Sequence, residues 1–173
     1  KFSKVYIIFM KILILQSRMG IGDMVIYLPY IEAIAKKFNT KVSLLVKESS
    51  KAEEILKNNK HIENIIFLKR SNKNQRHDGI VGSINLIKDL KKLKFNKIFI
   101  FNSSLRYNLI AKLSGIQEIH QYPLFQKKNQ HIIKAAQNFI KETLGVEIES
   151  NPIVEVNENE IIGVIGANGA GKS

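Results

Sequence analysis

Residues 11–46 read KILILQSRMGIGDMVIYLPYIEAIAKKFNTKVSLLV. The stretch begins with an apolar run at 11–17 and ends with another at 41–46, and both have the length of a buried β-strand. Between them, apolar residues recur at helical spacing from 24 to 38. A strand, a helix and a second strand in this order predict a βαβ unit, in which the two strands run parallel.

The same alternation continues along the chain. Apolar runs at 64–68, 97–101 and 117–122 predict further strands, and helical patterns lie at 49–59, 82–95, 104–115 and 129–145. The fold class expected from this order is α/β, with a Rossmann-like, mostly parallel sheet that carries helices on both faces.

Residue patterns in three of the expected helices predict further local features. Pro29 removes one helical hydrogen bond and should kink the first helix or restart it there. Ser50 and Glu53 have the spacing of a capping pair at the start of the second helix. The buried stripe of the helix at 82–95 is expected to consist of Ile84, Ile87, Leu90 and Leu93.

The composition narrows the possible classes of protein. With 173 residues, of which 45% are hydrophobic, the chain can bury a core of about one domain. It has no cysteine, which excludes disulfides and thiolate metal sites, and we expect no metal site. No run approaches the roughly 20 apolar residues of a membrane span.

The net charge of +12 fits either a lysine-solvated surface or a partner rich in phosphate or carboxylate. Nucleic acid is not expected, because aromatic residues are not interleaved with the basic ones.

Gly20, Gly22 and Asp23 follow the first strand, where a parallel sheet gathers its ligands. The two glycines give G-x-G, but Val25 stands where a dinucleotide fingerprint needs glycine, and the next strand ends at Lys47 without an acidic residue. Dinucleotide binding is therefore not expected. Asp23 is either a helix N-cap or first-turn residue, or a carboxylate held at the floor of a cleft.

The last residues, 161–173, read IIGVIGANGAGKS. They form an apolar strand followed by the complete pattern G-x-x-x-x-G-K-S, in which backbone N–H groups, a lysine and a serine hydroxyl typically hold phosphate and Mg²⁺. The candidate phosphate-binding residues are Gly166, Gly169, Gly171, Lys172 and Ser173.

Several stretches resemble the family 9 glycosyltransferases, the bacterial lipopolysaccharide heptosyltransferases. They are residues 10–46, with Gly22, Asp23 and Pro29 in the pattern of the family's opening, NKHIENIIF at 59–67, FNSSLRYNLIAKLSG at 101–115 and NQHIIKAAQNFIKETLGVE at 129–147. Asn102 departs from the family pattern, which has aspartate there more often. The resemblance covers residues 10 to about 150.

This resemblance implies the amino-terminal, acceptor-binding half of a GT-B fold. In the family, the aspartate that matches Asp23 is the general base that activates the acceptor hydroxyl. The implied reaction is transfer of a heptose-like sugar from a nucleotide-sugar donor, an ADP-sugar, to a lipopolysaccharide or other phosphorylated glycolipid, with no further cofactor. The enzyme would be cytoplasmic, and peripheral contact with the anionic inner membrane face would be compatible. Basic residues expected at the strand ends, where the acceptor phosphates could be held, are Arg18, Arg70, Arg76 and Arg106.

We therefore expect three parts: an upstream extension at 1–9, the acceptor domain at 10–150, and a linker with the first strand and glycine-rich loop of a truncated second domain at 151–173. The tail resembles both the donor domain of family 9 and the start of an ABC-transporter ATPase, which would bind ATP and Mg²⁺. A basic binding module without catalysis is a third alternative. As a truncated fragment, the chain is expected to be inactive by itself.

Overall fold

The computed structural model describes residues 10–70, 75–123 and 131–148. Their centre is a five-stranded sheet of order β3-β2-β1-β4-β5, in which every pair of neighbours is parallel. The strands are β1 (Ile12–Gln16), β2 (Val42–Val46), β3 (Ile62–Phe67), β4 (Lys97–Ile100) and β5 (Glu118–Gln121). The expected parallel α/β fold is confirmed. The expected segments at 1–9 and 151–173 lie outside the described residues.

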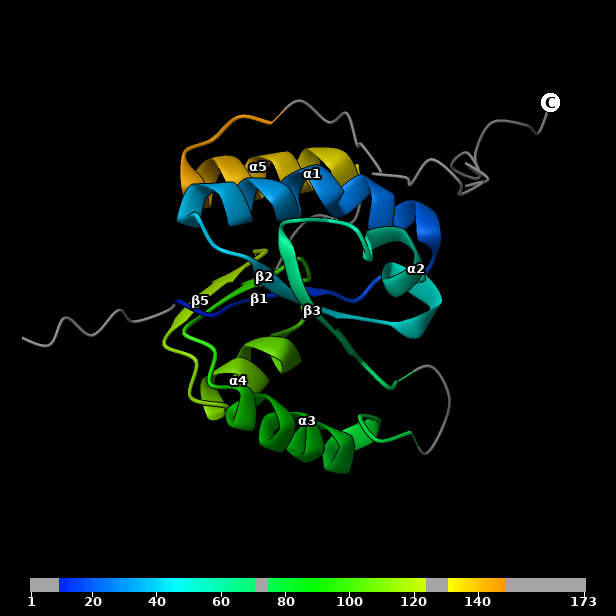
Figure 1. The fold of residues 1–173 in the computed structure, drawn as a ribbon. Coiled ribbons are helices and arrows are strands. Elements are labelled where there is room, and N and C mark those ends of the chain that lie inside the picture. Colours follow the sequence, from blue (N-terminus) through cyan, green and yellow to red (C-terminus); the bar gives the residue numbers. More distant parts are fainter. Residues whose placement is uncertain (1–9, 71–74, 124–130, 149–173) are drawn as a thin grey trace, which may run out of the picture.

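Helices cover both faces of the sheet, as Figure 1 shows. One face carries α1, α2 and α5, and the opposite face carries α3 and α4. The helices are α1 (Ile21–Phe38), the 3-10 turn η1 (Glu48–Ser50), α2 (Ala52–Leu56), α3 (Gly79–Leu93), α4 (Leu105–Leu113) and α5 (Ile132–Leu144). These layers bury the sheet on both sides.

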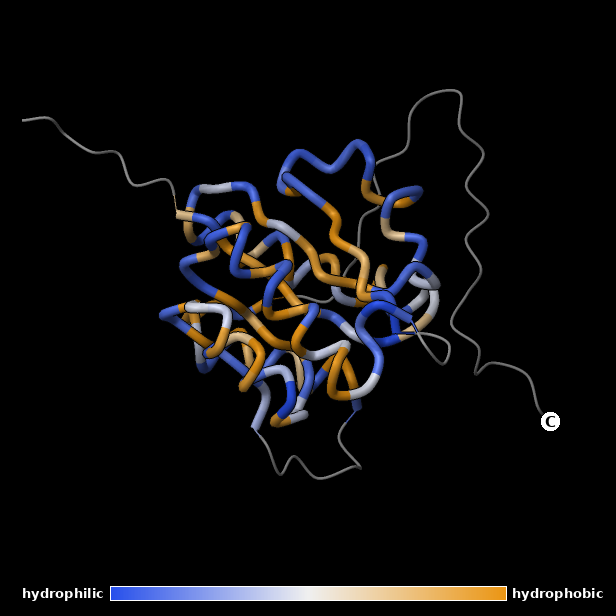
Figure 2. Tube along the Cα trace, turned by 90° about the horizontal axis from the view of Figure 1, so that it is seen from below, coloured by the Kyte–Doolittle hydropathy of each residue, from blue (hydrophilic) through white to orange (hydrophobic). Residues whose placement is uncertain are grey.

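Alternate side chains of each central strand pack into two separate hydrophobic cores, one on each face of the sheet. In β1, Ile12 and Ile14 pack toward α1 and α5, and Leu13 and Leu15 pack toward α3 and α4. Because both faces are covered, the strand is apolar at consecutive positions. The hydrophobic colour in Figure 2 accordingly runs through the interior of the molecule, and the turns around it are mostly hydrophilic.

The strand order fixes where ligands can gather. The chain passes from β1 through α1 to β2 on one side of β1, and after β3 it crosses through α3 to β4 on the other side. The direction of winding thus reverses between β1 and β4. Open parallel sheets bind their ligands at the carboxyl ends of the strands at such a switch point.

The first helix is one continuous element that contains Pro29, so a restart at this residue is wrong and the alternative, a kink, stays a prediction. The helix also begins earlier than expected, at Ile21, and Gly20 occupies the N-cap position. Asp23 is therefore a first-turn residue, and the N-cap alternative for it is wrong.

The expected capping pair of Ser50 and Glu53 does not form. The Ser50 hydroxyl donates instead to the Lys47 carbonyl at 2.6 Å, within η1. Lys51, in the left-handed region at φ 53°, precedes α2. The extra 3-10 turn separates the serine from the helix that it was expected to cap.

The buried stripe of α3 is only partly the expected one. Gly82, Leu86 and Leu90, spaced by four residues, face the core, whereas Ile84 is 47% exposed and Leu93 is 39% exposed. Gly82 also lies close to the His77 backbone, because a Cβ on Gly82 would lie 2.1 Å from the His77 carbonyl carbon. At this position a side chain would have to displace the segment that leads into α3.

Candidate functional site

The switch point is held together by amide side chains. Asn102, after β4, donates through Nδ2 to the Ser17 hydroxyl after β1 at 2.7 Å, and its Oδ1 accepts from the Ser104 N–H at 2.7 Å. Gln121, at the end of β5, donates to the carbonyls of Asn102 and Ser104, both at 2.9 Å. The carboxyl ends of β1, β4 and β5 are thus joined into one polar edge.

Asp23 reaches this edge from the first turn of α1, which follows the β1 end directly. Gly20 makes the turn at φ 103° and ψ 155°, a conformation that is open to glycine and strained for other residues. The Asp23 side chain is half-buried. A carboxylate in a first helical turn is stabilised by the positive end of the helix dipole, and the same charge would repel a phosphate.

Two tyrosines line the inner side of this region. The Tyr27 and Tyr122 hydroxyls lie 3.4 Å apart, and both rings make edge contacts with Phe101. Burial raises the pKa of Tyr27, while Tyr122 and the nearby Arg18 guanidinium act in the opposite direction and Asp23 adds to the rise. Burial is also the main cause of the raised pKa of Tyr122. Both phenols therefore stay neutral across the ordinary pH range, and their hydroxyls face each other inside the core.

Gln16, the last residue of β1, is a polar side chain in a buried position. Its exposed fraction is 0%, and neither its amide nitrogen nor its amide oxygen has a hydrogen-bond partner among the described residues. An amide buried in this way retains an unused donor and an unused acceptor.

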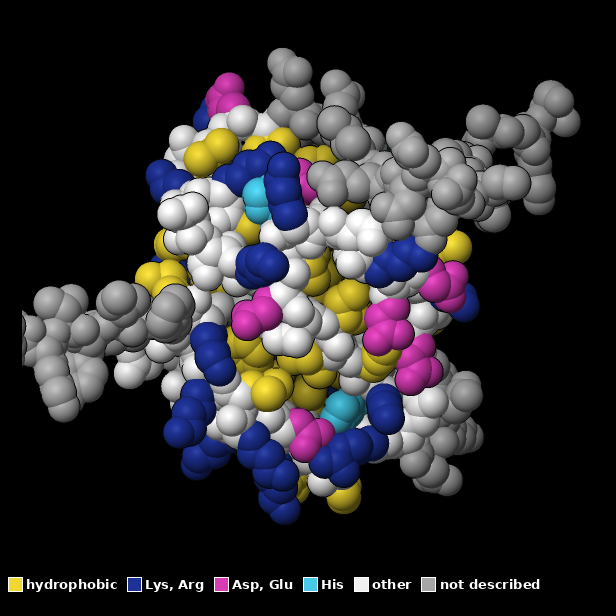
Figure 3. Space-filling view, viewed as in Figure 1, with side chains coloured by type: hydrophobic (Ala, Val, Ile, Leu, Met, Phe, Trp, Pro, Cys, Tyr) yellow, Lys and Arg dark blue, Asp and Glu magenta, His cyan; other side chains and the backbone are white. Residues whose placement is uncertain are grey.

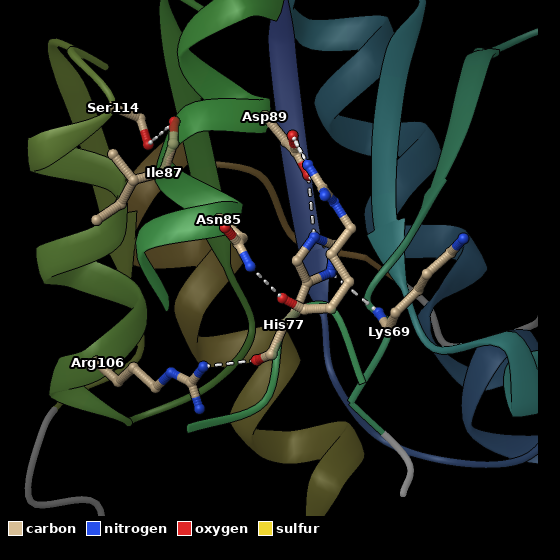
Figure 4. Close-up of polar contacts among 8 residues, drawn as sticks. Lys69, His77, Asn85, Ile87, Asp89, Arg106 and Ser114 are labelled. Atoms are coloured by element: carbon tan, nitrogen blue, oxygen red, sulfur yellow. Dashed lines mark hydrogen bonds and ion pairs between the residues drawn. The ribbon is translucent and has the colours of Figure 1, made fainter. Parts of the chain in front are cut away.

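A second polar group follows β3 and is drawn in Figure 4. The buried His77 accepts a hydrogen bond from the Lys69 N–H at Nδ1 (3.1 Å) and lies 3.1 Å from Asp89 through Nε2. Because Nδ1 is an acceptor, the neutral ring carries its proton on Nε2 and donates it to Asp89. Arg76 binds both oxygens of Asp89, at 2.9 and 2.6 Å. This bidentate contact is the main cause that lowers the pKa of Asp89 to about 2.

The structure separates the four arginines that were expected to hold the acceptor. Arg76 is engaged by Asp89, and Arg106 donates to the carbonyls of His77 at 2.8 Å and Gly79 at 3.2 Å. Burial lowers the pKa of Arg106. Arg70 lies 3.9 Å from Asp78, and Arg18 is exposed beside the first turn of α1. Arg18 and Asp23 are thus neighbours of one site, whereas the other three arginines surround the start of α3. Their roles in binding stay predictions.

Sequence patterns missed several residues of this edge. Tyr27 and Tyr122 lie far apart in the chain and have no local motif, and Gln121 and His77 gain their roles only from folding. The amide of Asn102 was visible as a departure from the family pattern, but its bond to Ser17 was not.

The tail lies outside the described residues, so its binding of ATP or phosphate stays a prediction. The candidate residues there are Gly166, Gly169, Gly171, Lys172 and Ser173.

Two other features, a membrane span and a metal site, are absent from the part of the chain that the structure describes. There, no helix is both long and apolar enough to span a membrane. Within the same residues, no three histidine, cysteine or acidic side chains come together in a way that could hold a metal ion.

Several known structures with a similar fold are glycosyltransferases. A family 9 glycosyl transferase from Veillonella parvula DSM 2008 matches with a TM-score of 0.60 and 15% identity, over 86% of this chain and 46% of that one. The E. coli ADP-heptose lipopolysaccharide heptosyltransferase II matches with a TM-score of 0.60 and 14% identity, over 86% and 47%. The E. coli heptosyltransferase WaaC with ADP matches with a TM-score of 0.57 and 14% identity, over 83% and 50%.

This chain therefore has a fold found in glycosyltransferases, and it spans about half the length of the structures that it matches. No protein-family model matches the sequence, and no curated protein matches it at a significant level.

Proposed function

We propose that this chain is the acceptor-binding domain of a glycosyltransferase that moves a heptose-like sugar from an ADP-linked donor to a phosphorylated glycolipid such as lipopolysaccharide. The observation that carries the proposal is the position of Asp23, which stands in the first turn of α1 at the switch point of a fold shared with heptosyltransferases. A half-buried carboxylate suits an uncharged acceptor hydroxyl there better than a nucleotide phosphate.

In this proposal Asp23 is the general base. As the acceptor oxygen forms its bond to the anomeric carbon, its proton passes to the carboxylate, and the bond from that carbon to the nucleoside diphosphate breaks. The electron pair of the broken bond leaves with the diphosphate. The negative charge of Asp23 would also stabilise the positive charge that develops at the anomeric centre. The part of the protein outside this domain would bind the nucleotide-sugar donor; one structural neighbour has been solved with ADP.

The edge around Asp23 is suited to hold a polyhydroxylated acceptor. Arg18 is exposed and offers a charge for an acceptor phosphate, and the buried Tyr27 lies behind this edge, where its ring supports the start of α1. The amide bridge between Asn102 and Ser17 keeps the two strand ends at a fixed separation. These groups come from two strand ends and one helix, so their spacing depends on the whole domain.

The direct test is a transfer assay with the full-length protein that contains this domain. ADP-heptose and a heptose-deficient lipopolysaccharide are the substrates, and the product is detected by mass spectrometry. We expect addition of one heptose to the acceptor. Absence of transfer to this acceptor and to a panel of other glycolipids, by protein that is folded and binds ADP, would contradict the proposal.

A further inference from the structure

The outward face of α4 is apolar although it is not part of the core. Leu105, Leu109 and Leu113 are spaced by four residues and are 55%, 50% and 63% exposed. The helix is held to the sheet by its opposite side, where Tyr107 and Ile110 are buried. The three leucines therefore contribute little to folding, and their exposure as one stripe calls for another explanation.

The neighbouring helix extends this surface. At the start of α3, Ile80 is 83% exposed and Val81 is 71% exposed. The helices α3 and α4 pack against one another on the same side of the sheet, the side that faces the viewer in Figure 2. We call the combined surface the α3/α4 apolar face; it consists of Ile80, Val81, Ile84, Leu105, Leu109 and Leu113.

Basic residues accompany this face. The exposed lysines of the same two helices and of the residue that follows α3 are Lys88, Lys91, Lys92, Lys94 and Lys112. The single acidic residue of α3 is Asp89, which is bound by Arg76 and His77, and α4 contains no acidic residue. Figure 3 shows lysine and arginine side chains gathered on the lower part of the molecule, where α3 lies. The surface thus combines apolar side chains with uncompensated positive charge.

The face also adjoins the carboxyl edge of the sheet. Both α3 and α4 begin at that edge, and Arg106 joins their starts through the carbonyls of His77 and Gly79. Ile80 and Leu105, in the first turns of the two helices, therefore lie beside the edge that carries the candidate site.

We propose that the α3/α4 apolar face docks on an anionic lipid bilayer. Leucine and isoleucine side chains would enter the boundary between headgroups and acyl chains, and the lysines would contact the anionic headgroups. A second copy of this chain fits less well, because a symmetric contact through this face would bring two sets of lysines together. The proposal does not depend on the proposed function, since lipid binding requires neither the sugar donor nor the acceptor.

The test is cosedimentation of the full-length protein with vesicles of phosphatidylcholine alone or mixed with phosphatidylglycerol. We expect binding to the mixed vesicles that weakens as salt is raised. L109Q/L113Q should weaken it at least tenfold, and so should K91Q/K92Q. The matched control K37Q/K134Q removes the same charge from exposed lysines of α1 and α5, on the opposite side of the sheet, and should change binding less than twofold.

Three outcomes would overturn the proposal. Equal loss of binding in K37Q/K134Q, or full binding by L109Q/L113Q, would show that net charge alone attracts the protein. Absence of binding to the mixed vesicles would also overturn it, and a concentration-dependent dimer in sedimentation velocity that L109Q/L113Q abolishes would then assign the face to a second copy of the chain. All of the substituted residues are exposed, so the variants should fold, and their melting temperatures verify this.

Discussion

The Asn102 amide donates to the Ser17 hydroxyl at 2.7 Å and so links the carboxyl ends of β4 and β1, two segments that are 85 residues apart in the chain. The link sits at the switch point of the sheet, and Ser17 precedes the start of α1, the helix that carries Asp23, by four residues. The geometry of the candidate site therefore depends on this contact.

Substitution of Asn102 tests the link. Asn102→Ala loses the bonds to Ser17 and to the Ser104 N–H, and we expect it to lower the free energy of unfolding by about 1–2 kcal/mol. Asn102→Asp should stay close to wild type, because its carboxylate can accept from the Ser17 hydroxyl and from the Ser104 N–H. Chemical denaturation compares the two. Equal destabilisation by both would show that the amide N–H group itself is indispensable.

The two glycines before and in the first turn of α1 should respond in opposite ways. Gly20 has φ 103°, so Gly20→Ala introduces backbone strain of about 1–3 kcal/mol. Gly22 is helical and a Cβ there would meet no atom within 4 Å, so Gly22→Ala should stabilise the helix by roughly 0.5–1 kcal/mol. Thermal unfolding of both variants provides the comparison. A stabilising Gly20→Ala would contradict the described turn.

Gly82 has a role of a different kind, because it makes room for the backbone at His77. A Cβ would lie 2.1 Å from the His77 carbonyl carbon and 2.6 Å from its oxygen. Gly82→Ala must therefore displace this segment, and we expect a loss of about 1–3 kcal/mol in the free energy of unfolding. NMR shifts of the His77 ring and the Lys69 amide should change with it. Gly22→Ala, the open helical position, is the matched control and should leave both signals in place.

Asp89 should make stability depend on acid pH. Its folded pKa of about 2 lies below the ordinary value of 3.8, so its ionised form favours the folded state. The ionised carboxylate adds on the order of 2 kcal/mol to the free energy of unfolding. This contribution is complete above about pH 4 and is lost as the pH falls toward 2. Asp89→Asn should therefore lower stability at pH 7 and flatten its decline in acid. Unfolding curves recorded from pH 7 to pH 2 measure both effects.

The matched control for Asp89 is Glu147→Gln. Glu147 also has a lowered pKa, caused by Lys141, but both side chains are largely exposed. An exposed pair of this kind adds little to stability, so this variant should keep the wild-type acid profile. An Asp89→Asn profile that is indistinguishable from wild type would mean that the contact of Asp89 with Arg76 and His77 does not stabilise the fold.

The sequence was sufficient for the order of the elements, because runs such as 12–16 and 42–46 are apolar at consecutive positions and the intervening segments have helical spacing. It was less reliable for contacts with the nearby backbone. Gly82 lies so close to the His77 backbone that a Cβ would not fit, and the Ser50 hydroxyl bonds to the Lys47 carbonyl instead of capping α2. The helix and strand propensities of single residues predict neither contact.

Some residues of the candidate site could be found from the sequence, and others are brought together only by the fold. Gly20, Gly22 and Asp23 are adjacent in the chain, so their pattern could be found without the fold. The pairing of Tyr27 with Tyr122 joins residues that are 95 positions apart, and no spacing rule indicates it. Arg76 and Arg106 illustrate the converse, since residues whose charge suggested ligand binding are engaged by Asp89 and by backbone carbonyls.

We propose that the Asp23 carboxylate acts in the chemical step of sugar transfer, and a single substitution in the full-length protein tests this role. Asp23→Asn keeps the size of the side chain and removes the proton acceptor. Glu53→Gln, which neutralises an exposed first-turn carboxylate of α2, is the control for loss of a charge at a helix start. Steady-state kinetics and melting temperature are measured for both variants.

We expect Asp23→Asn to lower kcat by about 10²-fold or more, with little change in the KM for the acceptor and in melting temperature, because the carboxylate acts mainly in the transition state. Glu53→Gln should leave kcat unchanged. A kcat near the wild-type value in Asp23→Asn would rule out a general-base role and would leave Asp23 as a residue that only stabilises the start of α1.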